Sequence, residues 1–241
     1  MKLSVVIPSY NEAERLPSTL KDIDNYLKKV DYNYEIIVVS DGSTDKTAQK
    51  IRELMKEINN LRLIDRKENK GKGYTIRQGL LESKGEYRLF TDADNSTSID
   101  QVEKIWPEFK DGADIVIGSR DIEGAKLVPP QPWWRQRVGD IFNLMVQTTL
   151  GLWGIWDTQC GFKAFKKEVV ETILPKCRID GFAFDPEILI LARKEDFKIK
   201  EIPIEWKNDP DSKVGFSSMF KMGKDLFKIR FNLLTKKYNS K

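Results

Sequence analysis

The first half of this chain alternates short apolar runs with longer amphipathic stretches, and this alternation constrains the fold most strongly. The run at residues 35–40 is almost unbroken, as in a strand that is buried on both faces of a sheet. Strand-like segments cover 3–8, 35–40, 61–65, 86–90 and 114–118, with helix-like segments between them at 14–29, 44–59, 73–83 and 99–110. The pattern predicts an α/β fold, Rossmann-like and doubly wound around a mostly parallel sheet.

The second half is less regular. We expect a loop at 128–134, a helix at 135–152, a short strand at 162–165, a helix at 186–194 and a strand at 198–206. No repeat or low-complexity linker divides the chain. We therefore predict one domain over residues 1–215, followed at 216–241 by a basic amphipathic C-terminal helix.

Each of the first four predicted strands is followed by a polar loop. These loops contain residues 8–12, residues 41–45, residues 69–73, and the pair Asp92 and Asp94. Loops at the carboxyl ends of parallel strands share one edge of the sheet, where ligands bind in such folds. Helix capping explains any single loop, and we expect Ser43 or Thr44 to be an N-cap. Four such loops together favour one functional cleft.

Asp92 and Asp94 directly follow a predicted strand, where the turning chain lets both carboxylates converge. Carboxylate oxygens suit hard cations such as Mg²⁺ or Mn²⁺, and the remaining ligands of such cations often come from phosphate groups. The pair therefore indicates a metal-diphosphate site. The alternative for this segment is a solvated turn with no ligand.

Missing residues and motifs exclude several classes of site. The chain has no histidine, which rules out Ser-His-Asp and Cys-His nucleophile systems and His-ligated zinc. The glycine fingerprint of dinucleotide-binding folds and the P-loop are both absent. The net charge of +4 is mild, and we expect no nucleic-acid partner.

Several features bear on location. The start of the sequence does not resemble a signal peptide, no apolar run approaches the ~20 residues that span a bilayer, and the two cysteines fit a reducing compartment. Residues 216–234 combine apolar side chains with Lys221, Lys224 and Lys228. Such a helix either lies in a membrane interface or docks on the core. We expect a cytoplasmic protein, peripheral on the cytoplasmic membrane face, with Trp133 and Trp134 as a further interfacial anchor.

Three segments carry a family resemblance: VVIPSYNE at 5–12, IVVSDGSTD at 37–45 and DAD at 92–94. They resemble the family 2 glycosyltransferases of GT-A fold. DTQCGFKAF at 157–165, FDPEIL at 184–189 and IPIEW at 202–206 are similar to segments of dolichyl-phosphate β-glucosyltransferases, among the polyprenyl-phosphate sugar synthases. The resemblance implies an inverting, metal-dependent hexosyltransferase with a nucleotide-sugar donor and a polyprenyl-phosphate acceptor.

The resemblance also implies roles on the donor side. Asp41 would accept a hydrogen bond from the base, Asp92 would contact the nucleotide and the metal, and Asp94 would bind Mg²⁺ or Mn²⁺. A Gln that joins the metal in several related mannose synthases is Ser96 here, so we leave it out of the ligand set. The remaining donor-side residues that we expect are Pro8, Tyr10, Glu12, Lys72 and Lys213.

On the acceptor side, Arg120 and Arg135 match the arginines that engage the acceptor phosphate in the mannose synthases, with Arg137 a close rival. Lys163 and Lys213 are weaker candidates. A phosphate monoester is already anionic near neutral pH, so it needs cations to position it rather than a base. Asp157 either orients these cations or serves as a base in a different kind of transferase.

Alternatives remain open at this stage. UDP-glucose is the favoured donor, and GDP-mannose is the alternative. The acceptor is a polyprenyl or dolichyl phosphate, or else a saccharide, in which case Asp157 would act as the base. A third hypothesis is a membrane-associated binding protein that has kept a degenerate fold. The intact Asp41, Asp92 and Asp94 argue against it.

Overall fold

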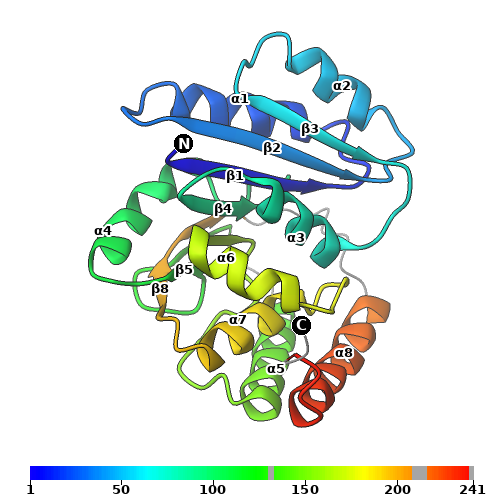
Figure 1. Ribbon diagram of the computed structural model, residues 1–241, viewed down its shortest axis with the longest axis vertical. Coiled ribbons are helices and arrows are strands. Elements are labelled where there is room, and N and C mark those ends of the chain that lie inside the picture. Colours follow the sequence, from blue (N-terminus) through cyan, green and yellow to red (C-terminus); the bar gives the residue numbers. More distant parts are fainter. Residues whose placement is uncertain (130–132, 208–215, 239–241) are drawn as a thin grey trace.

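A seven-stranded sheet forms the centre of the molecule, with the strand order β3-β2-β1-β4-β7-β5-β8 (Figure 1). The computed structural model describes residues 1–129, 133–207 and 216–238, and for residues 133–136, 138 and 216–219 it describes the backbone only. The strands are β1 (Leu3–Ser9), β2 (Tyr34–Asp41), β3 (Leu61–Arg66), β4 (Tyr87–Thr91), β5 (Ile115–Ser119), β6 (Lys126–Val128), β7 (Phe162–Lys166), β8 (Ile199–Pro203) and β9 (Glu205–Lys207). All neighbours in the large sheet pair in parallel except β7, so the predicted mostly parallel α/β architecture is confirmed.

Helices cover both faces of this sheet. They are α1 (Leu16–Leu27), α2 (Thr47–Leu54), α3 (Lys72–Glu82), the 3₁₀ helix η1 (Ile99–Lys104), α4 (Ile105–Lys110), α5 (Trp133–Leu150), α6 (Lys167–Ile173), the 3₁₀ helix η2 (Leu174–Lys176), α7 (Phe184–Lys194) and α8 (Phe216–Leu234). Within the described residues, no helix is both long and apolar enough to cross a membrane.

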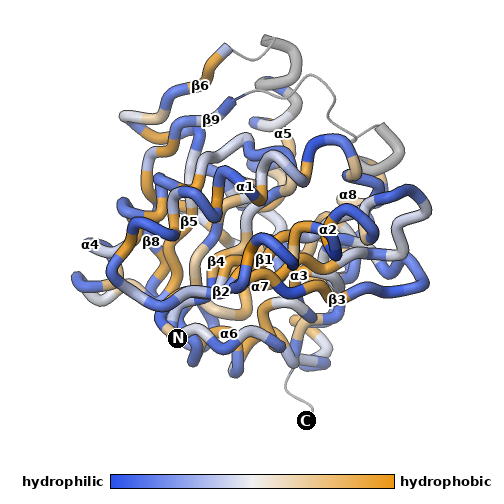
Figure 2. The backbone as a smooth tube through the Cα atoms, turned by 90° about the horizontal axis from the view of Figure 1, so that it is seen from above, coloured by the Kyte–Doolittle hydropathy of each residue, from blue (hydrophilic) through white to orange (hydrophobic). Residues whose placement is uncertain are grey.

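Alternating strand residues build two separate cores. Along β1, Val5 packs into a core with α1, α2 and α4, whereas Val6 packs into a core with α3, α5, α6, α7 and α8. Ile36 and Ile37 of β2 divide in the same way. Successive side chains of a strand point to opposite faces, so an almost unbroken apolar run is needed when both faces are covered. The strands accordingly appear hydrophobic where they cross the middle of the molecule, with hydrophilic loops around them (Figure 2).

Strand β7 lies between β4 and β5 and runs antiparallel to both. Its first residue, Phe162, pairs with Thr91, the last residue of β4. The segment before β7 therefore reaches the same sheet edge as the carboxyl ends of β4 and β5. This places residues from the second half of the chain beside Asp92.

Several local predictions were wrong. Helix α2 begins at Thr47 and has no side-chain cap, and Asp45 rather than Ser43 or Thr44 accepts the hydrogen bond of the Thr47 N–H, at 2.9 Å. The single helix predicted over 99–110 is η1 followed by α4, and the strand predicted over 198–206 is β8 followed by β9. Strand β6 and helix α6 were missed: β6 is a short strand whose partner, β9, lies far along the chain.

The helix predicted over 216–241 is shorter: α8 covers Phe216–Leu234, residues 235–238 form turns, and 239–241 lie outside the described residues. Apolar side chains lie on two sides of α8. Met222, Leu226 and Ile229 are buried in the core that α8 shares with α5. Phe220 and Phe227 are exposed. The helix therefore docks on the domain and also presents aromatic side chains to the solvent.

Replacing a buried residue of α8 should destabilise the protein more than replacing its exposed neighbour. Leu226→Ala should lower the free energy of unfolding by about 2–5 kcal/mol, because it leaves a cavity in the core. Phe227→Ala, at a side chain that is 65% exposed, should change it by less than about 0.5 kcal/mol. Urea denaturation measures both values, and equal losses would contradict the docking of α8.

Candidate active site

The loops after β1 and β2 are joined by hydrogen bonds from main chain to side chain. The Thr44 N–H donates to Asn11 Oδ1 at 2.8 Å, and the Glu12 N–H donates to Thr47 Oγ1 at 2.8 Å. Of the expected nucleotide contacts, Pro8 is partly exposed, Tyr10 is exposed, and Glu12 is buried beside Arg15, with which it forms an ion pair. The structure thus places these three residues at the sheet edge, and their contacts with a nucleotide stay a prediction.

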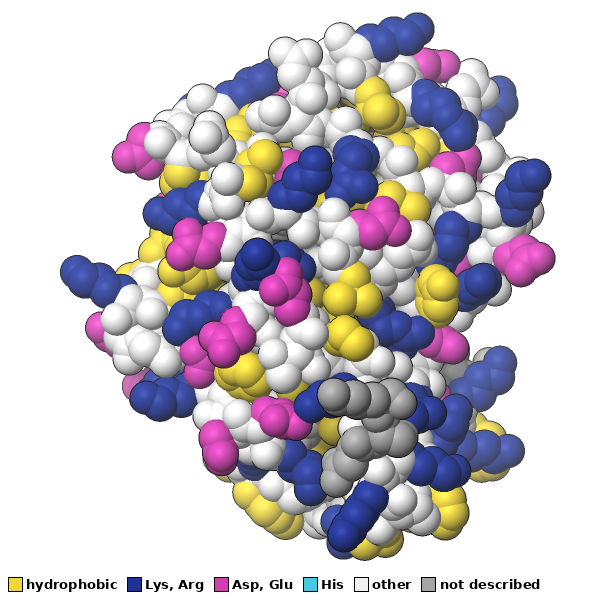
Figure 3. All heavy atoms as spheres, viewed as in Figure 1, with side chains coloured by type: hydrophobic (Ala, Val, Ile, Leu, Met, Phe, Trp, Pro, Cys, Tyr) yellow, Lys and Arg dark blue, Asp and Glu magenta, His cyan; other side chains and the backbone are white. Residues whose placement is uncertain are grey.

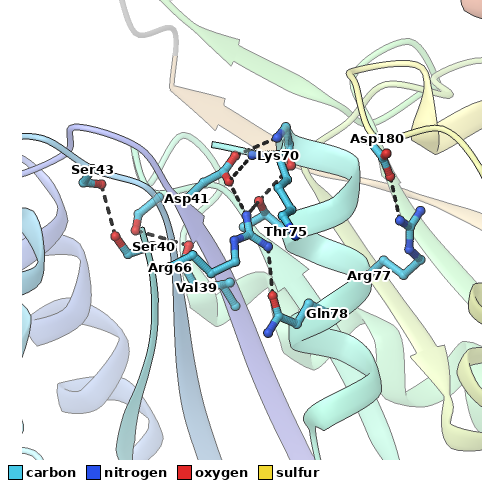
Figure 4. Close-up of polar contacts among 12 residues, drawn as sticks. Val39, Ser40, Asp41, Ser43, Arg66, Lys70, Thr75, Arg77, Gln78 and Asp180 are labelled. Atoms are coloured by element: carbon cyan, nitrogen blue, oxygen red, sulfur yellow. Dashed lines mark hydrogen bonds and ion pairs between the residues drawn. The ribbon is translucent and has the colours of Figure 1, made fainter. Parts of the chain in front are cut away.

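Asp41, the last residue of β2, anchors the loop between β3 and α3 (Figure 4). Its carboxylate accepts hydrogen bonds from the N–H groups of Lys70, at 2.7 Å, and Gly71, at 2.9 Å, and it pairs with the Arg66 guanidinium. Arg66 also donates to Thr75 of α3. Asp41 therefore fixes the residues that lead into Lys72, a structural role that the sequence did not reveal.

Lys72 is the first residue of α3 and reaches the carboxylate pair beyond β4. Its Nζ lies 2.6 Å from Asp92 Oδ1. Asp94, two residues further on, accepts a hydrogen bond from the Ser96 N–H at 2.9 Å. Burial, together with the negative charge of Asp92, raises the pKa of Asp94 above its usual range. Two carboxylates and one ammonium group thus meet at the edge where the sequence predicts a metal site.

Gly161 closes the site from the side of β7. A β-carbon at this position would overlap the Asp92 carboxylate where it now lies, so the segment before β7 passes this close to Asp92 because Gly161 has no side chain. Asp92 thus lies between Gly161 on one side and Lys72 on the other. The family resemblance includes segment 157–165 but assigns no role to Gly161.

The carboxylates of Asp92 and Asp94 suit a cation that binds the protein and a phosphate-bearing molecule at the same time. Within the described residues, no cluster of three or more Asp, Glu, His or Cys side chains is arranged to hold a metal. Asp92 and Asp94 supply carboxylate oxygens, the ligands that Mg²⁺ and Mn²⁺ prefer. Such a pair suits a cation whose other ligands are phosphate oxygens and water.

Arg120 lies just beyond β5 and is held by a bidentate ion pair. Its Nε and Nη2 lie 2.7 and 2.9 Å from the two oxygens of Asp157, and its guanidinium carbon lies 4.8 Å from the centre of the Trp206 ring. Although burial opposes ionisation, Arg120 holds the pKa of Asp157 below its usual range. Asp157 therefore orients Arg120, as one of the two sequence hypotheses expected, and Trp206 is a partner that the sequence did not identify.

Lys163 does not lie where an acceptor phosphate could reach it. Its side chain is 1% exposed, and its Nζ donates to Asp185 Oδ1 at 2.6 Å and to the Cys160 carbonyl at 2.5 Å. Burial raises the pKa of Asp185 to about 6, against the effect of Lys163. The pair supports the packing of β7 against α7, and the weaker hypothesis of a phosphate contact at Lys163 is wrong.

Two expected site residues cannot be placed. Arg135 lies in α5 where the backbone alone is described, and Lys213 lies outside the described residues. Their roles stay predictions, as does the role of Arg137, which is exposed on α5. The structure brings together Lys72, Asp92 and Asp94, joins Asp41 to the main chain just before Lys72, and places Arg120 and Asp157 at the same sheet edge through β7.

Comparison with known proteins points to one family. The sequence profile described as "Glycosyl transferase family 2" matches residues 4–174. Proteins named dolichyl-phosphate beta-glucosyltransferase are similar over nearly the whole chain. The one from Dictyostelium discoideum is 40% identical over 96% of this chain and 75% of its own length. The one from Saccharomyces cerevisiae is 38% identical, also over 96% of this chain and 75% of its own length.

Solved structures of similar fold come from glucosyl-3-phosphoglycerate synthase of Mycobacterium tuberculosis. Its complex with Mn²⁺, uridine diphosphate and phosphoglyceric acid aligns with a TM-score of 0.71 and 16% identity, over 98% of this chain and 78% of that chain. Its complex with Mn²⁺, UDP-glucose and phosphoglyceric acid aligns with a TM-score of 0.70 and 17% identity, over 100% of this chain and 80% of that chain. At this identity the likeness establishes the fold.

Gly161→Ala should disturb the carboxylate pair more than the fold. The added methyl group displaces Asp92, so we expect Mn²⁺ affinity to fall by at least about tenfold, with a loss of about 1–3 kcal/mol in the free energy of unfolding. Gly139→Ala in α5, where a β-carbon meets no neighbour within 4 Å, is the matched control. Calorimetric Mn²⁺ titration and urea denaturation measure these effects, and unchanged Mn²⁺ affinity in Gly161→Ala would contradict the described contact.

Proposed function

This chain belongs to glycosyl transferase family 2, and from that premise we propose that it transfers glucose from UDP-glucose to a polyprenyl phosphate of the dolichyl type. The observation that carries the proposal is the meeting of Asp92 and Asp94 with Lys72 beyond β4, beside the loop held by Asp41. This arrangement suits a nucleotide diphosphate and a divalent cation. The names of the similar glucosyltransferases support the choice of sugar and acceptor.

Asp92 and Asp94 would hold Mg²⁺ or Mn²⁺. When held by these two carboxylates, the cation would supply positive charge to stabilise the negative charge that grows on the departing diphosphate. Lys72, which already lies beside Asp92, would add a positive charge on the same side. The donor side of the site thus favours departure of the diphosphate without a proton donor.

The acceptor phosphate would attack the anomeric carbon directly. A bond forms between a phosphate oxygen and C1 of glucose, while the bond from C1 to the diphosphate oxygen breaks and UDP leaves with the electron pair. A phosphate monoester has its second pKa near 6, so it is already anionic at neutral pH and needs no base. One direct displacement inverts the anomeric centre and gives a β-linked product from an α-linked donor.

Arg120 is the described residue best suited to orient the acceptor phosphate. Asp157 and Trp206 hold its guanidinium in one position, and Nη1 takes no part in the ion pair with Asp157. Arg135 is proposed as a second cation. A saccharide acceptor would instead require Asp157 as a base, and its bidentate pairing with Arg120 makes Asp157 a poor proton acceptor.

A donor panel tests the proposed reaction. We expect the purified chain to transfer glucose from UDP-glucose to polyprenyl phosphate in detergent, only when Mn²⁺ or Mg²⁺ is present, and to use GDP-mannose at least about tenfold less well. Asp94→Asn should lower the rate at least about 100-fold, because the variant loses a charged ligand of the cation. Asp111→Asn, at an exposed turn after α4, is the control.

Two results would overturn this assignment. Faster transfer from GDP-mannose than from UDP-glucose would identify mannose, and not glucose, as the transferred sugar. A loss in Asp157→Asn as large as that in Asp94→Asn, together with transfer to a free saccharide, would favour the base-dependent alternative. Radiolabelled sugar recovered in the organic phase distinguishes a lipid product from a soluble one.

We further propose that α5 and α8 rest on the cytoplasmic face of a membrane, where the acceptor lies. The two helices pack side by side, and both expose apolar side chains, such as Ile141 of α5 and Phe227 of α8. Lys and Arg side chains gather over α8 in Figure 3. Apolar and basic side chains on one helix suit the interface of an anionic membrane.

The exposed phenylalanines of α8 should determine membrane affinity. Replacing Phe220, Phe227 and Phe231 together by serine removes apolar area that would enter the interface, so binding to vesicles of phosphatidylcholine and phosphatidylserine should fall by at least about tenfold. Met55→Ser with Leu81→Ser, at exposed apolar positions elsewhere, should have no effect. Co-sedimentation measures binding, and equal binding of both variants would contradict the proposal.

A further inference from the structure

The Lys72 ammonium group lies beside the Asp92 oxygen that a bound cation would also use. Its Nζ lies 2.6 Å from Asp92 Oδ1, and the side chains of Lys72 and Asp92 are 26% and 23% exposed. Mg²⁺ bonds oxygen at about 2.1 Å, so a cation on the same oxygen would lie within about 5 Å of the ammonium group. Two positive groups that close repel one another, which opposes cation binding while Lys72 holds Asp92.

Gly161 limits the movement of Asp92 on one side only. The Asp92 carboxylate lies against the backbone of Gly161, so it cannot move further in that direction. The main chain before Lys72 is also fixed, because the Gly71 N–H donates to Asp41 at 2.9 Å. The longer and more flexible side chain of this contact is that of Lys72, on its four-carbon stem.

Among the described residues, two other carboxylates act on Lys72: Asp94, which is the second proposed ligand of the cation, and Asp185, which is already paired. Asp185 acts on Lys72 electrostatically, but its Oδ1 accepts a hydrogen bond from Lys163 at 2.6 Å. The three carboxylates Asp92, Asp94 and Asp185 face two lysines, which leaves one net negative charge. Binding of a divalent cation would make the net charge of this cluster positive, and binding of a diphosphate would make it negative again. A bound diphosphate is thus the partner that Lys72 can take when it leaves Asp92.

We propose that Lys72 couples the binding of the cation to the binding of the nucleotide diphosphate. Without the diphosphate, Lys72 neutralises Asp92 and competes with the cation. With the diphosphate bound, the Lys72 ammonium moves to a phosphate oxygen and releases Asp92, so each ligand strengthens the binding of the other. Such coupling is reciprocal by thermodynamic necessity. The inference rests on the proposed function and adds to it an order of assembly, in which the cation enters with the nucleotide.

The test is a binding cycle on the full chain with Mn²⁺ and UDP as probes. In the parent protein, UDP should raise Mn²⁺ affinity, measured by calorimetry and by electron paramagnetic resonance of free Mn²⁺. In Lys72→Met, Mn²⁺ alone should bind about tenfold more tightly than in the parent, and the enhancement by UDP should shrink by about tenfold. These readouts do not depend on catalytic turnover.

Two further variants make the result specific. Lys72→Arg keeps the positive charge and should keep both the weak binding of Mn²⁺ alone and the enhancement by UDP. Lys67→Met, at an exposed lysine earlier in the same connection, should behave like the parent. Circular dichroism and thermal unfolding verify that each variant is folded.

The outcomes separate this inference from the proposed function. If Mn²⁺ alone binds Lys72→Met no more tightly than the parent while UDP still enhances it, the coupling role of Lys72 is wrong and the proposed function stands. If the parent binds neither Mn²⁺ nor UDP, the proposed function fails and the coupling fails with it. Tighter Mn²⁺ binding in Lys72→Met with weaker enhancement by UDP supports the inference.

Discussion

The antiparallel strand β7 is the constraint on which the arrangement of the site depends. It lies between β4 and β5, and because it runs against them, its start lies at their carboxyl ends. The segment before it therefore crosses the edge of the sheet where ligands bind. Gly161 thereby lies against Asp92, and Asp157 lies against Arg120. A parallel strand at this position would carry that segment to the opposite edge and separate the two halves of the site.

Several polar residues at this edge are candidates for ligand binding and also form contacts within the protein. Asp41 binds the main chain of the next loop, and Asp157 binds Arg120 with both of its oxygens. Such contacts fix the positions of the site residues before any ligand arrives, which favours precise binding. The contact between Lys72 and Asp92 differs, because it joins a candidate metal ligand to a flexible cation. A ligand that uses Asp92 has to change this contact.

The parts of the fold that the sequence predicted are those with a strong local pattern. Strands buried on both faces read as unbroken apolar runs, and their positions were predicted to within about two residues. Strand β6, which depends on a distant partner, was missed: it pairs with β9 from another part of the chain. The division of residues 99–110 into two helical elements was also not predicted. Lys163 was a weaker candidate for the acceptor phosphate because the sequence does not show its partner, Asp185, which comes from another element.

The sequence by itself determined the α/β class, and it predicted the sheet edge of the candidate site and the pair Asp92 and Asp94, because each follows from residues close together in the chain. The tertiary structure decided which charges meet. Asp41 with Arg66, Lys72 with Asp92, and Arg120 with Asp157 are pairs from separate elements, and their partners depend on strand order and direction. Periodicity and motifs fix where a strand ends, whereas contacts between elements arise when the whole chain packs around two cores.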